Sequence, residues 1–528
     1  MRRRRLSGAQ CDIAVVGSGF AGSLLAMIAQ RLGRSVILLE KGKHPRFAIG
    51  ESSTPLANLL LEDLTTRYDL PALKPLAKWG PWQRTYPRVG CGLKRGFTFY
   101  HHTLGETPVA DPDRAKQLLV AASPHNNIAD THWYRADFDE LFVREAQNTG
   151  VAYLDEVQLH SVSESDDDLR LHGTRSGEEL TIRAKFVVDA TGPRGFLHRI
   201  LGISERALPG LPSTQGLFSH FSHVERIEDE RTARYSEEPP YPVDDAAVHH
   251  VFDGGWIWVL QFNNGITSAG VAATMKFAER LEFAKGAPAW ERLLNLVPAL
   301  RNQFASARQH RSFTHAPRLS FRSGAIVGRR WALLPSTAGF IDPLLSTGFT
   351  LTLLGIARLA EIIERNWNTD RFRTSLDVYA DQTENELLAA GRLIACLYKS
   401  MGDFPLFVSL SLVYFAAVSY SETVRRLGKP HLANSFLLHD HPAFGPQCRL
   451  LFDRILCARG PLDSKELTGE IVRIIDPFNV AGLGDPERNN WYPVKAEDLF
   501  RSASKVGATP DEIGQLLDRS GFRTVQPT

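Results

Sequence analysis

The chain has 528 residues, 43% of them hydrophobic and 23% charged, which is enough to bury the cores of two or three domains. Its formal net charge of +2 argues against a general nucleic-acid-binding protein. The cysteines are odd in number, scattered and free of Cys-x-x-Cys pairs, so neither a disulfide framework nor a metal site is predicted. The basic start, Met1 to Arg5, leads into a strand without an apolar signal region, which predicts a cytoplasmic protein.

A βαβ unit with a glycine-rich turn is predicted at residues 12–40. Gly17 permits the tight turn, Gly19 lets the backbone approach a pyrophosphate, and Gly22 lets the helix pack on the strand. Glu40 ends the second strand, where an acidic side chain binds ribose hydroxyls. NAD and FAD use this unit alike. The predicted dinucleotide contacts are Gly17, Gly19, Phe20, Ala21, Gly22, Glu40 and Lys41.

The next segment, residues 47–55, is predicted to lie over the cofactor and to open a helix at 56–68. Gly50 permits a sharp bend, and Pro55 suits the first turn of the helix. The candidate cofactor contacts in and before this loop are Arg46, Gly50, Glu51, Ser52 and Ser53.

The middle of the chain reads as a return to the first sheet followed by an insertion. The apolar strand 186–189 is predicted to rejoin the first sheet. Residues from about 200 to 320 are predicted to form a mostly antiparallel inserted sheet, with strands at 248–262 and 267–273. The charged, proline-containing segment 225–245 is predicted to be a loop or lid.

A second candidate cofactor contact precedes a predicted helix at 349–366, after short strands at 325–327 and 331–334. Asp342, beside Pro343, is placed to accept from a sugar or ribityl hydroxyl. The free N–H groups of Thr347 and Gly348 are placed to hold a flavin carbonyl or a small anion. An ordinary helix N-cap explains the same residues.

Beyond about residue 375 the chain is predicted to be helical, with a capping box opening the last helix at 509–512. The nearly uncharged stretch 404–420 is short for a membrane span and contains a proline, so a buried helix or the wall of an apolar pocket is predicted instead. The chain contains no sequence motif of a zinc peptidase, a serine hydrolase or a Walker nucleotidase. Chemistry by a bound organic cofactor is therefore predicted.

Four motifs in order resemble those of the flavin-dependent halogenase family. They are the glycine turn at 17–22, the segment from Pro45-Arg46 to Pro55, the Gly254-Gly-Trp256-Ile-Trp258 sequence, and the turn from Gly339 to Gly348. The resemblance covers about residues 10 to 370, and the remainder matches nothing recognised.

The resemblance implies an α/β protein with a Rossmann-like FAD-binding fold, an inserted mostly antiparallel substrate sheet and a helical C-terminal region. Residues 1–375 would form the FAD-binding core with its insertion, and residues 376–528 would cover the substrate site. It further implies an oxidoreductase of secondary metabolism. Reduced FAD, supplied by a separate flavin reductase, would react with oxygen and with chloride or bromide to yield hypohalous acid.

In such enzymes a lysine delivers the halogen to a small aromatic substrate, free or tethered to a carrier protein. Lys94 matches the place of that lysine; without the resemblance it would be interpreted as an exposed loop residue. The resemblance also implies a halide site at Thr347 and Gly348, and a partition between flavin and substrate at Trp256 and Trp258. Both tryptophans point to one face of a strand.

Two departures from the family pattern keep alternatives open. Gln261 stands in the sequence that follows the tryptophan pair, where a proline is usual. This favours a flavin monooxygenase or oxidoreductase of the same fold that performs no halogenation; a non-catalytic flavoprotein subunit is a further alternative. Leu345 replaces the glutamate found in halogenases of free tryptophan, which points to phenol- or pyrrole-type substrates.

Overall fold

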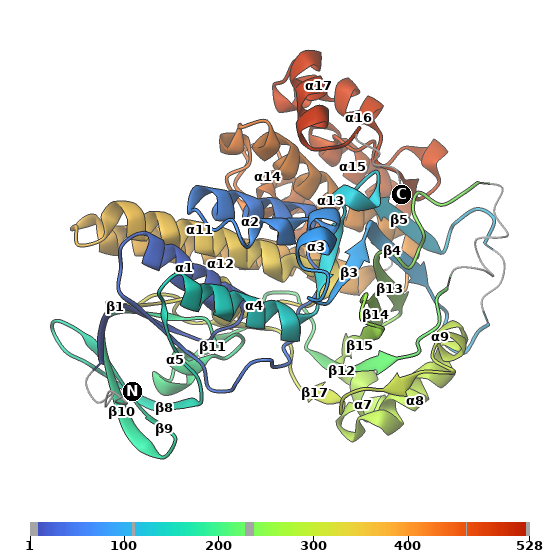
Figure 1. Cartoon of the computed structure of the whole chain (residues 1–528). Helices are drawn as coiled ribbons and strands as arrows, with labels where there is room; N and C mark the ends of the chain where they lie inside the picture. Colours follow the sequence, from blue (N-terminus) through green and yellow to red (C-terminus); the bar gives the residue numbers. More distant parts are fainter. Residues whose placement is uncertain (1–8, 108–110, 228–236, 461, 524–528) are drawn as a thin grey trace.

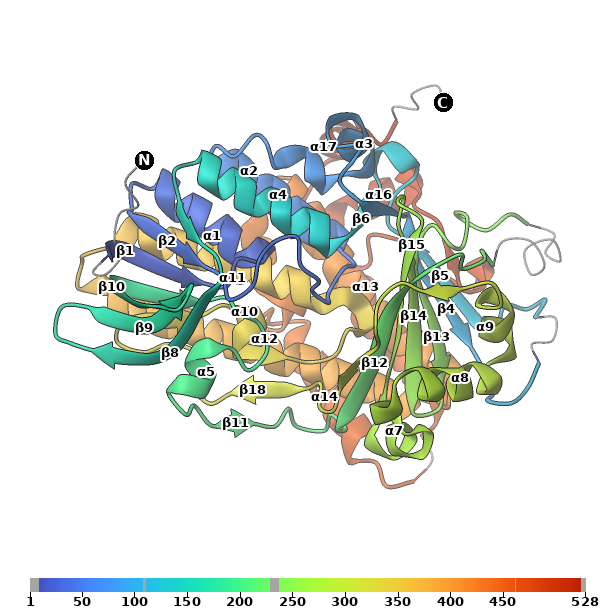
Figure 2. The ribbon, with the colours of Figure 1, turned by 60° about the horizontal axis from the view of Figure 1, so that its bottom comes forward.

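The computed structural model describes residues 9–107, 111–227, 237–460 and 462–523. The basic start and the central part of the expected loop at 225–245 lie outside these ranges. The chain forms two large sheets at opposite ends of the molecule, with long helices running between them (Figures 1 and 2).

The first sheet is built on the buried strand β1 (Ala9–Val16), which pairs in parallel with β2 (Val36–Leu39) and with β10 (Glu178–Asp189). The helix α1 (Phe20–Arg31) follows β1 directly. The prediction that residues 186–189 rejoin the first sheet is therefore confirmed. The remaining strands of this sheet are β7 (Ala152–Leu154), β8 (Val157–Glu164), β9 (Leu169–Arg175) and β19 (Trp331–Leu333).

The second sheet contains the expected antiparallel insertion, with β12 (Thr214–Ser222), β13 (Ala247–Phe252), β14 (Gly255–Gln261) and β15 (Ile266–Thr274). It also takes strands from outside the insertion, because β13 pairs in parallel with β4 (Gly96–His101). β4 then pairs with β5 (Gln117–Ala121), and β5 pairs with β21 (Trp491–Tyr492) near the end of the chain. The other edge carries β16 (Arg308–Gln309) and β17 (Thr314–Ala316).

Three long helices connect the two ends of the molecule: α11 (Thr347–Asn366), α12 (Arg371–Ser400) and α13 (Phe404–Arg426) (Figure 2). Among the described residues, two helical segments, 344–366 and 404–426, are long and apolar enough to cross a membrane, but they are 67% and 83% buried inside the protein. Core helices meet the same criteria of length and composition. The prediction of a buried helix at 404–420 is confirmed.

The C-terminal region is helical as expected, apart from β21. The capping box of α17 (Pro510–Arg519) is present, with Thr509 and Glu512 exchanging hydrogen bonds.

The strand predicted at 325–327 is wrong, because Val327 makes only an isolated bridge to Ala332. The other helices are α2 (Pro55–Arg67), α3 (Trp79–Thr85), α4 (Arg135–Asn148), α5 (Phe196–Ile200), α7 (Met275–Leu281), α8 (Ala287–Leu296), α9 (Pro298–Gln303), α10 (Pro335–Ala338), α14 (Gly445–Cys457), α15 (Ser464–Ile475) and α16 (Ala496–Arg501).

Two small sheets complete the fold. The ribbon of β3 (Cys91–Lys94) and β6 (Asp130–Trp133) is antiparallel and buried. The other sheet consists of β11 (Glu205–Arg206), β18 (Phe321–Ser323) and β20 (Gly339–Phe340).

Candidate active site

The glycine turn between β1 and α1 has no room for side chains at two of its positions. Gly17 has a φ of +100°, and a Cβ there would stand 2.6 Å from the carbonyl oxygen of Ala190. A Cβ on Gly22 would stand 1.9 Å from the carbonyl oxygen of Gly17. These contacts are the close packing that a dinucleotide-binding turn needs. Ala21, in the first turn of α1, is buried.

Two guanidinium groups face the turn at Gly19. A Cβ at Gly19 would lie 3.4 Å from Nη2 of Arg135 and 3.6 Å from Nη2 of Arg46. The N-terminus of α1 adds its positive dipole end at the same place. The turn therefore fits a diphosphate group, as an FAD cofactor would present.

Sequence reasoning missed Arg135 and Asp139 of α4. The guanidinium of Arg135 makes two hydrogen bonds of 2.8 Å to the carboxylate of Asp139. Asp139 also accepts from the backbone N–H of Phe20 at 3.2 Å, and Arg135 donates to the carbonyl oxygen of Gly50 at 2.9 Å. The pair thus joins α1, α4 and the loop over the turn. An Arg and an Asp four residues apart on an otherwise apolar helix face were the available signal.

Glu40 lies where a ribose-binding carboxylate is expected and is 8% exposed. It accepts from the backbone and side chain of Ser18, from the N–H of Gly42 and from Arg46. Burial alone would raise the pKa of Glu40, but Arg46 and these N–H donors outweigh burial and hold the pKa below its usual value. The carboxylate is therefore charged at neutral pH. Lys41, next to it, is exposed.

The loop that ends in residues 50–53 is fixed on β6. Gly50 adopts a φ of +91°. The carbonyl oxygen of Glu51 accepts from the N–H of Trp133, and the Ser53 hydroxyl donates to the carbonyl oxygen of Thr131 at 2.6 Å. The buried Glu51 carboxylate lies 2.9 Å from His220. The loop is consequently held as one rigid piece beside the glycine turn.

Lys94 ends β3 and is fully buried, so the interpretation as an exposed loop residue is wrong. Its Nζ donates to the hydroxyl of Ser52 at 2.8 Å and to the carbonyl oxygen of Ser53 at 2.5 Å. Nζ also lies 3.8 Å from the ring centroid of Phe97. Burial lowers the pKa of Lys94 to about 7. The amine can therefore exchange protons near neutral pH.

The tryptophan pair lies on one face of β14, as predicted. The ring centroids of Trp256 and Trp258 are 5.7 Å apart, and both side chains are buried. The Trp256 Nε1–H donates to Asp342 Oδ1 at 3.1 Å, and the Tyr398 hydroxyl donates to Oδ2 at 2.8 Å. The Asp342 carboxylate thus orients Trp256 and joins three elements. Its predicted contact with a cofactor hydroxyl stays a prediction.

The turn before α11 leaves open space beside Gly348. After Pro343, both Leu345 and Ser346 adopt left-handed backbone conformations, with φ of 63° and 54°. α11 then starts at Thr347, and Gly348 is exposed with no atom within 4 Å of a would-be Cβ. An open N-terminus of a 20-residue helix suits a small anion. The halide site at Thr347 and Gly348 stays a prediction.

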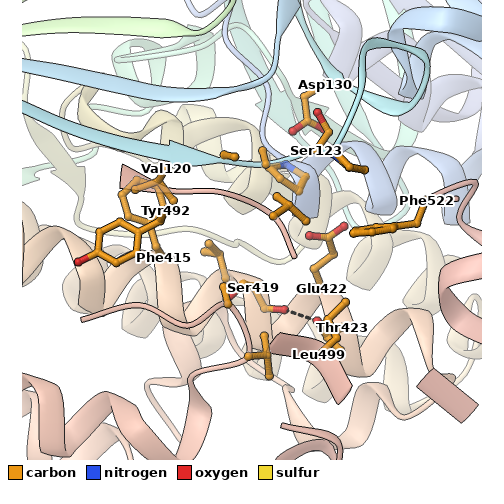
Figure 3. A pocket seen from close by; sticks show the side chains of 18 of the residues that line it. Val120, Ser123, Asp130, Phe415, Ser419, Glu422, Thr423, Tyr492, Leu499 and Phe522 are labelled. Carbon is orange, nitrogen blue, oxygen red and sulfur yellow. Dashed lines mark hydrogen bonds between the residues drawn. The ribbon is translucent and has the colours of Figure 1, made fainter. Parts of the chain in front are cut away.

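A cavity of about 180 Å³ lies near Lys94. Figure 3 shows the side chains that line it. Phe97, beside Lys94, is part of its wall, as is Asp130, the register partner of Lys94 in the β3–β6 ribbon. α13 and the C-terminal region supply most of the opposite wall, including Phe415 and Tyr492. Lys94 therefore lies between the loop at the glycine turn and the wall of a largely apolar cavity.

Comparison with known proteins identifies the family. The model of the family described as tryptophan halogenase matches residues 122–403, which is more than half of the chain. The chain belongs to this family. It is a flavin-dependent halogenase, and the alternatives without halogenation are not supported.

The chain is similar to curated halogenases. The tetracycline 7-halogenase of Kitasatospora aureofaciens is 29% identical over 96% of this chain and 95% of its own length. The monodechloroaminopyrrolnitrin halogenase PrnC of Pseudomonas fluorescens is 27% identical over 75% of this chain and 69% of its own length. The similarity thus extends well beyond residue 370, where the motif resemblance ended. Other matched halogenases are named for a pyrrole attached to a peptidyl carrier protein.

A solved structure has the same fold. The halogenase PltM, in complex with phloroglucinol and FAD, matches with a TM-score of 0.76 and 25% identity, over 91% of this chain and 99% of its own. The expected α/β fold with a helical C-terminal region is confirmed. The helical region is therefore part of the halogenase fold.

Proposed function

We propose that this halogenase binds FAD along the glycine turn and halogenates an electron-rich aromatic ring in the cavity beside Lys94. The observation that carries the proposal is the position of Lys94. Its amine contacts Ser52 and Ser53 on the cofactor side and lies against Phe97, which lines the cavity. The buried Lys94 thus lies between the proposed cofactor site and the proposed substrate cavity.

Bound reduced FAD, with oxygen and halide, supplies hypohalous acid. The guanidinium groups of Arg46 and Arg135 would hold the diphosphate, and Glu40 would hold the ribose. Lys94 would hydrogen-bond hypohalous acid through its ammonium group. Trp256 and Trp258 would keep the substrate away from the flavin ring.

The test is a single assay. Purified protein is supplied with FAD, a flavin reductase, NADH, oxygen, and either chloride or bromide. Phenols and pyrroles are offered both free and attached to a carrier protein, and the products are read by mass spectrometry. A halogen isotope pattern supports the proposal. A gain of one oxygen, independent of halide, contradicts it.

Lys94→Ala tests the role of the lysine. We expect halogenated product to fall at least about a hundredfold, because no other group replaces the buried ammonium. FAD binding, followed by flavin fluorescence, should stay unchanged because the glycine turn is intact. Halogenated product at the wild-type rate from Lys94→Ala would refute the assignment.

A separate flavin reductase is part of the proposal. Without the reductase we expect no turnover, and adding chemically reduced FAD in its place should restore turnover. Absence of product under those conditions, with product in the full mixture, would show that the reductase does more than deliver reduced flavin.

A further inference from the structure

Asp130 has a buried carboxylate that is only half satisfied. Its side chain lines the cavity and is 6% exposed. Oδ1 accepts from the side-chain amide of Asn58 at 2.8 Å. Oδ2 has no hydrogen-bond partner among the described residues. A buried carboxylate oxygen without a donor is costly, so its retention in a cavity wall points to a donor on the ligand.

The carboxylate lies close to the halogenating lysine. Asp130 and Lys94 are directly opposite one another in the β3–β6 ribbon, so their Cβ atoms are roughly 5 Å apart. Phe97, whose ring lies against Nζ of Lys94, lines the same cavity. A ring bound between Phe97 and Asp130 would therefore contact the Asp130 carboxylate and lie close to Lys94.

The facing wall carries a second carboxylate, which is paired with a cation. Glu422 of α13 also lines the cavity, and Figure 3 shows it on the wall opposite Asp130. Its Oε1 accepts from Arg426 at 2.8 Å, so the charge of Glu422 is paired. Lys78, a third charged group of the lining, lies 3.9 Å from Glu62. Of these two carboxylates, that of Glu422 is paired with a cation, whereas the buried Oδ2 of Asp130 has no hydrogen-bond partner among the described residues.

We propose that Oδ2 of Asp130 binds the hydroxyl group of a phenolic substrate and takes its proton as the ring attacks the halogen at Lys94. This inference rests on the proposed function and names its substrate class. A phenol has a pKa near 10, within reach of a positioned base, whereas a pyrrole N–H is far less acidic. Loss of the phenolic proton also makes the carbon next to the hydroxyl more nucleophilic.

The step balances as follows. The ring carbon bonds to the halogen of hypohalous acid, the halogen–oxygen bond breaks, and the departing hydroxide takes a proton from the Lys94 ammonium to give water. The phenolic proton passes to Asp130, leaving a neutral dienone. The ring C–H proton then passes to the Lys94 amine, and Asp130 returns its proton to the oxygen. The sum is phenol plus hypohalous acid giving halophenol plus water.

The surroundings of Asp130 suit this role. Burial raises the pKa of Asp130 and the charge of Glu422 adds to the effect, while Lys94 opposes it, so the carboxylate is a stronger base than an exposed one. Asn58 holds the carboxylate in place through the other oxygen.

Asp130→Asn tests the inference, because its side-chain oxygen can still accept from Asn58. Each enzyme is given a phenol and its O-methyl ether, and the two kcat/KM values are compared. The wild type should prefer the phenol. In Asp130→Asn we expect kcat/KM for the phenol to fall about 10²- to 10³-fold. That for the ether should fall far less, only by the effect of losing the Asp130 charge that raises the pKa of Lys94. A merely structural role would lower both values alike.

Asp63→Asn is the matched control. Asp63, on the same helix as Asn58, interacts with Arg425 and Arg426 but is not among the residues that line the cavity. It should keep the phenol-to-ether ratio of the wild type. Asp130→Ser, a smaller uncharged side chain, gives a second reading of the ratio if Asp130→Asn does not fold.

The outcomes separate the two proposals. Hypohalous acid production, followed with a diffusible chemical trap, should be the same in wild type and Asp130→Asn. An unchanged phenol-to-ether ratio in the folded Asp130 variant overturns the role of Asp130 and leaves the proposed function intact. Absence of both hypohalous acid and halogenated product from the wild type overturns the proposed function itself.

Discussion

The buried carboxylate of Asp342 links protonation to stability. Burial raises the pKa of Asp342 to about 6, although Leu344, Tyr398 and Trp256 all donate to it. In the unfolded chain the same carboxyl ionises near 3.8. The folded state therefore binds more protons between pH 4 and pH 6, and the stability contributed by this group falls as the pH rises through that window.

Asp342→Asn should remove the loss of folding stability that the buried Asp342 carboxylate causes at neutral pH. The amide oxygen can accept from Trp256 and Leu344, while the amide nitrogen faces the Tyr398 hydroxyl. We expect the variant to match the wild type near pH 4 and to exceed its stability by up to about 3 kcal/mol at pH 7. Thermal unfolding between pH 4 and pH 7 measures the difference. A difference that does not grow with pH would contradict the burial of this charge.

Lys94 shows why part of the site escapes sequence reasoning. Its residue type and place in a motif predict the chemistry, but its burial depends on pairing with β6, about 36 residues away. Asp130 is unremarkable in the sequence, since nothing local marks it as the partner of Lys94. Burial by segments distant in the sequence shifts the pKa of both side chains, and the attraction between the two charges opposes both shifts.

At the scale of elements, the glycine turn and the helix starts follow from local rules. Gly17 and Gly22 occupy positions where a Cβ would strike backbone, and Pro55 stands in the first turn of α2, as the sequence indicated. Thr54 caps this helix. These features depend on neighbours a few residues apart. The composition of the second sheet could not be foreseen, because β4 and β21 join it through contacts with distant segments.

Two glycines in helices should respond in opposite ways to alanine. In Gly22→Ala the new Cβ meets the Gly17 carbonyl oxygen at 1.9 Å, so the turn must shift. We expect FAD affinity to fall at least tenfold and stability to fall by about 2–3 kcal/mol. Flavin fluorescence titration and thermal unfolding provide the two measurements.

The control for that variant is Gly514→Ala in α17. A Cβ there meets nothing within 4 Å, so alanine should stabilise the helix by about 0.5–1 kcal/mol without changing FAD affinity. Equal losses of stability and FAD affinity in Gly22→Ala and Gly514→Ala would show that these helices need glycine for a reason other than space.

Across the whole molecule, the C-terminal region completes the cavity that lies near the N-terminal residue Lys94. α13 and the segments from residue 480 onward form most of the wall opposite β4 and β5 (Figure 3). The long helices between the sheets carry this region back over the ribbon that holds Lys94 (Figure 1). We therefore propose that substrate selection lies mainly in the C-terminal part, and cofactor binding in the N-terminal part.

Val418→Trp tests this division of labour. Val418 is half-buried and lines the cavity, so an indole there takes up space needed by the substrate. We expect KM for a phenol to rise at least tenfold while FAD affinity stays unchanged. Val378→Trp, on an exposed position of α12, is the control and should change neither value. A rise in KM from both variants would mean that the cavity is not the substrate site.

The short strand β21 makes the cavity depend on residues near the end of the chain. Residues 491 and 492, which pair with β5, follow more than nine-tenths of the chain. A product that stops before this point has the glycine turn and Lys94 but lacks a wall of the cavity. Such a fragment would lack the C-terminal side of the proposed substrate site, so it should bind the aromatic substrate more weakly than the full chain.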